Sequence, residues 1–197
     1  MFFQASAAVS TPGSGKERLY INKCFVTASQ DPNSKIKYTV IDNYGCMIDG
    51  KVTSYSKFLP ADSKEVQKFS VGAFIFKNTA LTASQQRLYM HCEISMGPLS
   101  PTPTSKACNF NPATKKWEAL YGKDCICDCC SSTCSSAKPN GAPKTLISSP
   151  SWKVGLSSMD EHVKGDSQMK SSDADTLSLK EPDLAEFKDF QNYWSHD

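Results

Sequence analysis

The sequence predicts an all-β chain whose core is a β-sandwich followed by a mostly disordered tail. Five to seven segments have the composition and alternation of β-strands, and no convincing helical pattern occurs before residue 135. All nine cysteines lie in residues 1–134, whereas residues 135–197 are rich in Ser, Lys and Asp. A chain of 197 residues is long enough to bury a core of its own.

The first half of the chain contains a strong hairpin signal. Segments 18–28 and 36–41 are rich in β-branched and aromatic residues, and the turn-forming stretch SQDPNSK separates them. We therefore expect these two segments to pair as antiparallel strands. Shorter strands are predicted at three other places, residues 2–9, 51–58 and 117–120.

Two further strands are predicted by alternation with a period of two. In segment 88–96 one face carries Leu88, Met90, Cys92, Ile94 and Met96. His91 lies on the opposite face and is expected to be exposed. Segment 69–75 alternates in the same way. This pattern is typical of half-buried antiparallel strands.

Cys24 and Cys92 each lie in the middle of a predicted strand, 68 positions apart. A disulfide between the two sheets of a sandwich has this appearance, and it would stabilise the fold by roughly 4 kcal/mol through loop closure. The alternative is a pair of buried free thiols, which requires a reducing compartment.

Five cysteines are crowded into the stretch KDCICDCCSSTC, residues 123–134. A zinc finger or ribbon needs two Cys-x2-Cys knuckles, or cysteine pairs followed by a histidine pair, and this stretch supplies neither set. A thioredoxin-like centre at Cys127 and Cys130 would need a surrounding α/β pattern. A disulfide knot is therefore favoured, and it implies an oxidising compartment. Because nine is an odd number, one thiol is free or paired outside the chain.

Composition and motifs do not favour an enzyme or a nucleic-acid-binding protein. The net charge is only +2, divided into +5 for residues 1–134 and −3 for residues 135–197. The sequence has no Gly-x-Ser-x-Gly motif, phosphate loop or clustered carboxylate pair, so we predict no catalytic residue, cofactor or metal. It also has no apolar run of about 18 residues, so no membrane span is expected.

Sugar attachment is expected to be O-linked, because the sequence has no Asn-x-Ser/Thr acceptor. The stretch LSPTPTSK is the expected carrier. Its acceptors are Ser100, Thr102, Thr104 and Ser105. In the tail, a short amphipathic helix is expected near Leu184, Phe187 and Tyr193.

Six motifs together resemble one known family. RLYINKC, NYGCMIDGK, FSVGAFIF, LYMHCEI, KACNF and CDCCSSTC occur in this order and at these intervals in the C-terminal half of the zona pellucida (ZP) module. The resemblance covers about residues 2–134. It implies an immunoglobulin-like ZP-C sandwich at residues 13–134 with a disulfide-rich subdomain at about 106–134. Residues 1–12 would be the interdomain linker and first strand, and residues 135–197 the tail.

The resemblance also assigns the cysteines. It implies that Cys24 pairs with Cys92 and so links the two sheets. The remaining six of the family pattern match Cys46, Cys108, Cys127, Cys129, Cys130 and Cys134, whose pairing stays open. Cys125 has no counterpart in the pattern and is the candidate for an unpaired or intermolecular thiol.

The function implied by the resemblance is that of a secreted structural subunit of the egg coat. Such a subunit would assemble with other zona pellucida subunits and take part in binding sperm surface proteins. Two alternatives are a non-polymerising secreted ZP-domain binding module or receptor ectodomain fragment, and a cytosolic metal-binding protein. A signal peptide, a ZP-N half and a dibasic processing site are expected in family precursors and do not occur in this sequence, so we expect a partial gene product.

Overall fold

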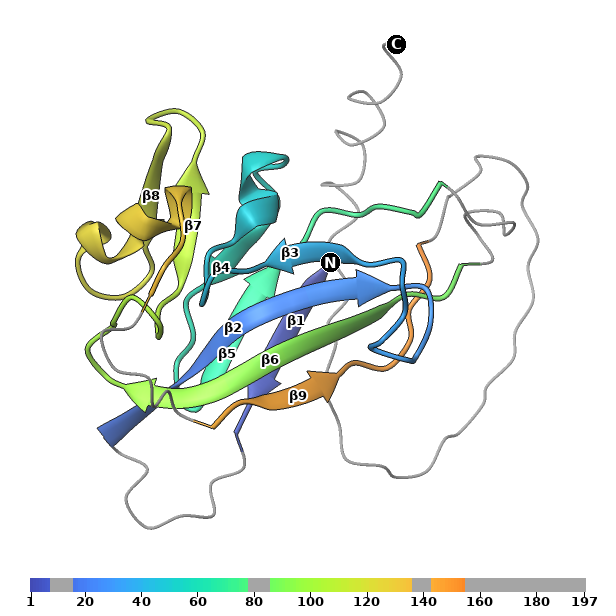
Figure 1. The fold of residues 1–197 in the computed structure, drawn as a ribbon, viewed down its shortest axis with the longest axis horizontal. Coiled ribbons are helices and arrows are strands. Elements are labelled where there is room, and N and C mark those ends of the chain that lie inside the picture. Colours follow the sequence, from blue (N-terminus) through green and yellow to red (C-terminus); the bar gives the residue numbers. More distant parts are fainter. Residues whose placement is uncertain (8–15, 78–85, 136–142, 155–197) are drawn as a thin grey trace, which may run out of the picture.

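The protein is built from two facing β-sheets and a small hairpin. The computed structural model describes residues 1–7, 16–77, 86–135 and 143–154 (Figure 1). Its strands and 3-10 helices are β1 (Phe2–Ser6), β2 (Glu17–Thr27), β3 (Tyr38–Ile41), η2 (Ile48–Lys51), β4 (Lys57–Leu59), β5 (Val66–Ser70), β6 (Tyr89–Pro98), β7 (Cys108–Asn111), β8 (Lys116–Ala119), η4 (Asp124–Ser131) and β9 (Thr145–Ser148). Among these residues no helix is long and apolar enough to cross a membrane.

The two main sheets have the orders β3-β2-β6-β9 and β1-β5-β4, and β7 pairs with β8. Every strand pair is antiparallel. One buried cluster joins the facing sheets, with Leu19 and Val26 from one sheet and Phe58 and Phe69 from the other. The predicted all-β sandwich is therefore confirmed, and residues 18–28 and 36–41 contain the expected hairpin of β2 and β3.

A β-bulge sets which residues of β2 face the core. The register against β6 shifts between Ile21 and Lys23, so Ile21 and Cys24 both belong to the core cluster although they are three positions apart. Strict alternation would have turned Cys24 outward, because successive side chains of a strand point to opposite faces.

The predicted strand at residues 51–58 is wrong over most of its length. Residues 48–51 form η2 instead, and only Lys57 and Phe58 belong to a strand. The buried carboxylate of Asp49 accepts hydrogen bonds from the hydroxyls of Tyr38 and Ser56, which ties this stretch down as a turn. Segment 69–75 also differs, since β5 ends at Ser70.

The prediction that His91 is exposed is wrong, because its side chain is fully buried. His91 Nε2 lies 2.8 Å from Thr27 Oγ1, and Nδ1 lies 2.7 Å from Ser148 Oγ on β9. The ring also packs against Phe25, which Lys37 covers in turn. Neighbouring side chains therefore cover the outer face of this sheet around His91. The burial lowers the pKa of His91 below its ordinary value.

Strand β9 lies inside the region predicted to be mostly disordered. Residues 145–148 pair with β6, and Trp152 exchanges backbone hydrogen bonds with Leu88. This part of the predicted tail thus belongs to the sandwich, as Figure 1 shows. The expected amphipathic helix lies outside the described residues.

Candidate functional site: the cysteine-rich subdomain

The subdomain begins with the hairpin of β7 and β8. Asn111 Oδ1 accepts backbone hydrogen bonds from Ala113 and Thr114, and Lys115 has a φ of 55°, so the connecting turn is closed by local contacts. Trp117 packs edge to face against Phe110 with ring centroids 5.4 Å apart. A lone two-stranded hairpin is only marginally stable, so the subdomain needs further support.

Three disulfides supply that support. They join Cys46 to Cys130, Cys108 to Cys127 and Cys129 to Cys134. Five of these six cysteines form one buried cluster with Trp117, and Cys129 packs against it. The structure thus brings together the six cysteines whose pairing the sequence left open. Cys125, also in η4, is free and exposed.

The fourth disulfide joins Cys24 to Cys92 within one sheet. These residues lie directly opposite each other on the neighbouring strands β2 and β6, with Cα atoms 4.2 Å apart. This short spacing is typical of a non-hydrogen-bonded antiparallel pair. The expectation that this bridge links two sheets is therefore wrong, because both strands belong to the same sheet.

A tight turn connects the sandwich to the subdomain. Asn43, Tyr44 and Gly45 all have positive φ angles, and the φ of Gly45 is 99°. A Cβ atom on Gly45 would lie 2.0 Å from the carbonyl oxygen of Lys106, so only glycine fits here. The turn places Cys46 beside Cys108, whose backbone N–H donates to the Gly45 carbonyl at 2.8 Å.

Lys106 is fully buried at the same junction. Its Nζ donates to the carbonyls of Asn43, Tyr44 and Pro103 at 2.9, 3.2 and 2.7 Å, and it lies 3.2 Å from Cys134 Sγ. Burial lowers the pKa of Lys106 to about 8. Three carbonyl acceptors match the three N–H donors of an ammonium group, so they favour the charged form.

Two asparagine side chains hold the subdomain in place. Asn109 donates to the Phe58 carbonyl and accepts from the Phe58 N–H, which attaches β7 to β4 of the sandwich. Asn43 accepts from the Cys134 N–H at 2.8 Å and donates to the carbonyls of Cys129 and Ser132. No sequence pattern marks Asn109 or Lys106, and the only signal at Asn43 is that it begins a turn-forming Asn-Tyr-Gly stretch.

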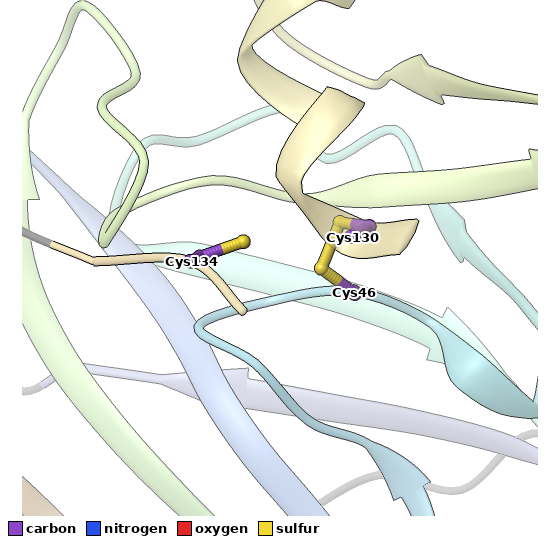
Figure 2. A group of neighbouring side chains, drawn as sticks. All are labelled: Cys46, Cys130 and Cys134. Atoms are coloured by element: carbon purple, nitrogen blue, oxygen red, sulfur yellow. A yellow bond between two sulfur atoms is a disulfide. The ribbon is translucent and has the colours of Figure 1, made fainter. Parts of the chain in front are cut away.

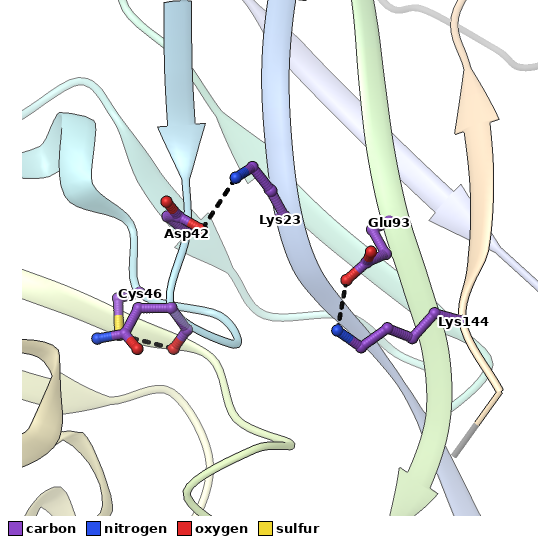
Figure 3. Close-up of polar contacts among 6 residues, drawn as sticks. Lys23, Asp42, Cys46, Glu93 and Lys144 are labelled. Carbon is purple, nitrogen blue, oxygen red and sulfur yellow. Dashed lines mark hydrogen bonds and ion pairs between the residues drawn. The ribbon is translucent and has the colours of Figure 1, made fainter. Parts of the chain in front are cut away.

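An open groove of about 650 Å³ lies between this subdomain and the outer face of the sandwich. Two ion pairs stand at its wall, Lys23 with Asp42 at 3.5 Å and Lys144 with Glu93 at 2.7 Å (Figure 3). All four side chains are partly exposed, so these pairs contribute little to stability. Lys144 Nζ also lies 4.7 Å from the ring centre of Tyr44.

The predicted sugar acceptors are not equally accessible. Ser100 is exposed, and Thr102 and Thr104 are half-buried. Ser105 is only 8% exposed, and its backbone bonds to Thr102 in a tight turn. A bulky glycan requires an exposed acceptor, so Ser105 is a poor one.

Three sulfur atoms converge where the sandwich meets the subdomain. The Sγ atoms of Cys46, Cys130 and Cys134 all lie within 4.8 Å of one another (Figure 2). All three are bonded in disulfides, and a disulfide sulfur lacks the negative charge of a thiolate zinc ligand. In this oxidation state the cluster is a structural centre.

Comparison with known proteins shows the family of the sandwich. The family model of the zona pellucida ZP-C domain matches residues 1–109, which is more than half of the chain. The chain belongs to the zona pellucida domain family. The match ends inside β7 of the cysteine-rich subdomain, so most of that subdomain lies beyond it.

This chain is similar to the zona pellucida sperm-binding protein 3 of several animals. The protein of Mesocricetus auratus is 30% identical over 155 residues, which cover 77% of this chain and 35% of the relative. The proteins of Rattus norvegicus and Gallus gallus are 33% and 32% identical, covering 61% and 63% of this chain and 29% and 28% of their own lengths. The chain thus spans about a third of the length of these relatives.

Proposed function

We propose that this chain is the ZP-C part of an egg-coat subunit that takes part in sperm binding. Its membership of the zona pellucida domain family carries the proposal, and the similar proteins of hamster, rat and chicken are each named sperm-binding protein 3. In this role the chain is secreted into the extracellular matrix, assembles with other zona pellucida subunits and meets sperm surface proteins. We propose a structural role and no catalytic one.

The disulfide pattern supports an extracellular structural role. Four bridges cross-link the described residues, and such bridges persist in oxidising compartments. The Cys46–Cys130 bridge joins the turn after β3 to η4, and Asn109 attaches β7 to β4. Sandwich and subdomain are therefore cross-linked into one unit, which suits the repeat of a filament.

The segment 99–105 is our proposed site of sugar display. Its acceptors that are not buried are Ser100, Thr102 and Thr104, and Leu99 is also 38% exposed. Sugars attached here would project from the end of β6, beside the subdomain. We therefore propose three of the four acceptors expected from the sequence and leave out the buried Ser105.

The test uses the purified full-length chain with its disulfides intact as a competitor. We expect it to lower the number of sperm bound per egg, and antibodies raised against it to label the egg coat. The matched control is the same chain reduced and alkylated, which should not compete. Equal sperm binding with and without the native chain, together with no labelling of the egg coat, would refute the proposal.

A further inference from the structure

We propose that the convergent sulfur cluster is a thiol–disulfide exchange site in which Cys134 is the reactive thiol and Lys106 activates it. An external dithiol opens the Cys129–Cys134 bridge, and Cys134 then attacks the neighbouring Cys46–Cys130 bridge. The subdomain thereby acquires a second covalent pairing. This inference does not depend on the egg-coat role.

The first step is set by exposure. Cys129 is partly exposed, whereas Cys134 is only 2% exposed and Cys46 is fully buried. An incoming thiolate therefore reaches the Cys129 sulfur first. It forms a mixed disulfide with Cys129, the Cys129–Cys134 bond breaks, and its electron pair leaves on Cys134 as a thiolate.

Lys106 favours this leaving group. Its Nζ lies 3.2 Å from Cys134 Sγ, and the surrounding carbonyls favour the ammonium form. A neighbouring ammonium group lowers the pKa of a thiol, and a thiol of lower pKa leaves faster from a disulfide. Solvent screens this charge pair only weakly, because Lys106 is fully buried.

The second step is set by proximity. The Cys134 sulfur lies within 4.8 Å of both sulfurs of the Cys46–Cys130 bridge. Figure 2 shows its side chain directed toward that bridge. Asn43 accepts from the Cys134 N–H, so Cys134 stays in place after its own bridge has opened. Such positioning makes exchange effectively unimolecular.

The atoms and electrons balance as follows. The Cys134 thiolate forms a bond to one sulfur of the Cys46–Cys130 bridge, and the other sulfur leaves as a thiolate. The second thiol of the dithiol then releases Cys129 and becomes part of an oxidised, cyclic disulfide. The dithiol loses two electrons, and the protein gains two thiols, one on Cys129 and one on Cys46 or Cys130.

The experiment maps thiols after limited reduction. The exposed Cys125 of the full-length chain is first blocked with iodoacetamide, and the protein is then treated briefly with limiting dithiothreitol. New thiols are trapped with N-ethylmaleimide and located by fragmentation mass spectrometry. We expect the label on Cys129 and on Cys46 or Cys130, with Cys134 unlabelled.

Two results would overturn the proposal. Label on Cys129 and Cys134 with the Cys46–Cys130 bridge intact would show that no exchange follows opening. Label that first appears on a bridge other than Cys129–Cys134 would contradict the order of steps. Both outcomes are read from the wild-type chain, so they do not depend on a variant that folds.

A variant pair isolates the lysine. Lys106→Met should slow the appearance of the new Cys134 bridge about tenfold, because the thiolate loses its ammonium partner. Lys123→Met removes an exposed lysine that directly precedes η4, and it should leave the rate unchanged. Equal rates in the two variants would refute the role assigned to Lys106.

Discussion

The disulfide between β2 and β6 should contribute more to stability than the short bridge inside the subdomain. Cys24 and Cys92 are 68 residues apart, whereas Cys129 and Cys134 are five apart. On the chain-entropy model, closing loops of these lengths in the unfolded chain stabilises the folded state by about 4 and about 2 kcal/mol. The Cys46–Cys130 and Cys108–Cys127 bridges together open a shorter path of about 40 residues between Cys24 and Cys92, which lowers the loop-closure contribution by only about 0.4 kcal/mol.

The perturbation replaces both cysteines of one bridge by alanine, in a Cys125→Ser background that removes the free thiol. Urea unfolding followed by far-ultraviolet circular dichroism gives the free energy of unfolding. We expect losses of about 4 kcal/mol for Cys24→Ala with Cys92→Ala and about 2 kcal/mol for Cys129→Ala with Cys134→Ala. Cys125→Ser alone should change stability by less than about 0.5 kcal/mol, because Cys125 is exposed and unbonded.

The ranking of the two bridges is the decisive result. Equal losses, or a larger loss for the short bridge, would show that loop closure does not govern their contributions. A loss below about 1 kcal/mol for the long bridge would mean that the β2–β6 pairing already restrains the unfolded chain.

Three further changes test other contacts. Gly45→Ala should cost more than about 3 kcal/mol of unfolding free energy, since its Cβ would collide with the Lys106 carbonyl, whereas exposed Gly122→Ala should cost about 1 kcal/mol; equal costs would contradict the collision. Burial lowers the folded-state pKa of His91, so its contribution to stability is present above pH 6.5 and is lost as the pH falls toward that lowered pKa. The thermal midpoint of wild type should therefore fall more between pH 7.5 and 5 than that of His91→Gln, and parallel falls would refute this. Asn109→Ala should cost about 1–3 kcal/mol in urea unfolding, because it leaves a backbone N–H and C=O of β4 without their partner, and a change below about 0.5 kcal/mol would show that water replaces the side chain.

Local patterns were sufficient to predict much of the sandwich. The hairpin of β2 and β3 combines two β-rich segments with a strong turn, and β6 alternates with a period of two, so both follow from neighbouring residues. Strand β9 has no such local signal. It is four residues long and mostly exposed, and it exists through pairing with β6, whose His91 is 57 positions from Ser148. A contact between residues so far apart in the sequence does not produce a periodic pattern of apolar residues that could be recognised in the sequence.

The environment of His91 was missed for the same reason. Alternation places it correctly on the face opposite Cys92, but alternation does not show what covers that face. The cover comes from Phe25 and Thr27 on one neighbouring strand and Ser148 on the other. An outward-facing position is exposed only where no other segment packs over it.

For the candidate site, the sequence identified the participating cysteines but not their connections. Six cysteines allow fifteen pairings, and spacing alone does not choose among them. The choice depends on the turn at Gly45, which places Cys46 beside the subdomain, and on η4, which presents Cys127 and Cys130 to the same buried cluster. The buried position of Lys106 likewise depends on carbonyls supplied by residues 43 and 44, more than 60 positions away.

The cysteine-rich subdomain is best regarded as an extension of the sandwich and not as a separate domain. The family match ends at residue 109, yet this boundary cuts through β7 and separates Cys108 from its partner Cys127. The side chain of Asn109, the last matched residue, bonds to β4, and the Cys46–Cys130 bridge ties η4 to the turn after β3. A chain ending at the matched boundary would leave Cys46 and Cys108 without partners and the hairpin without its second strand. We therefore expect residues 110–135 and, through β9, residues 145–148 to unfold together with the sandwich.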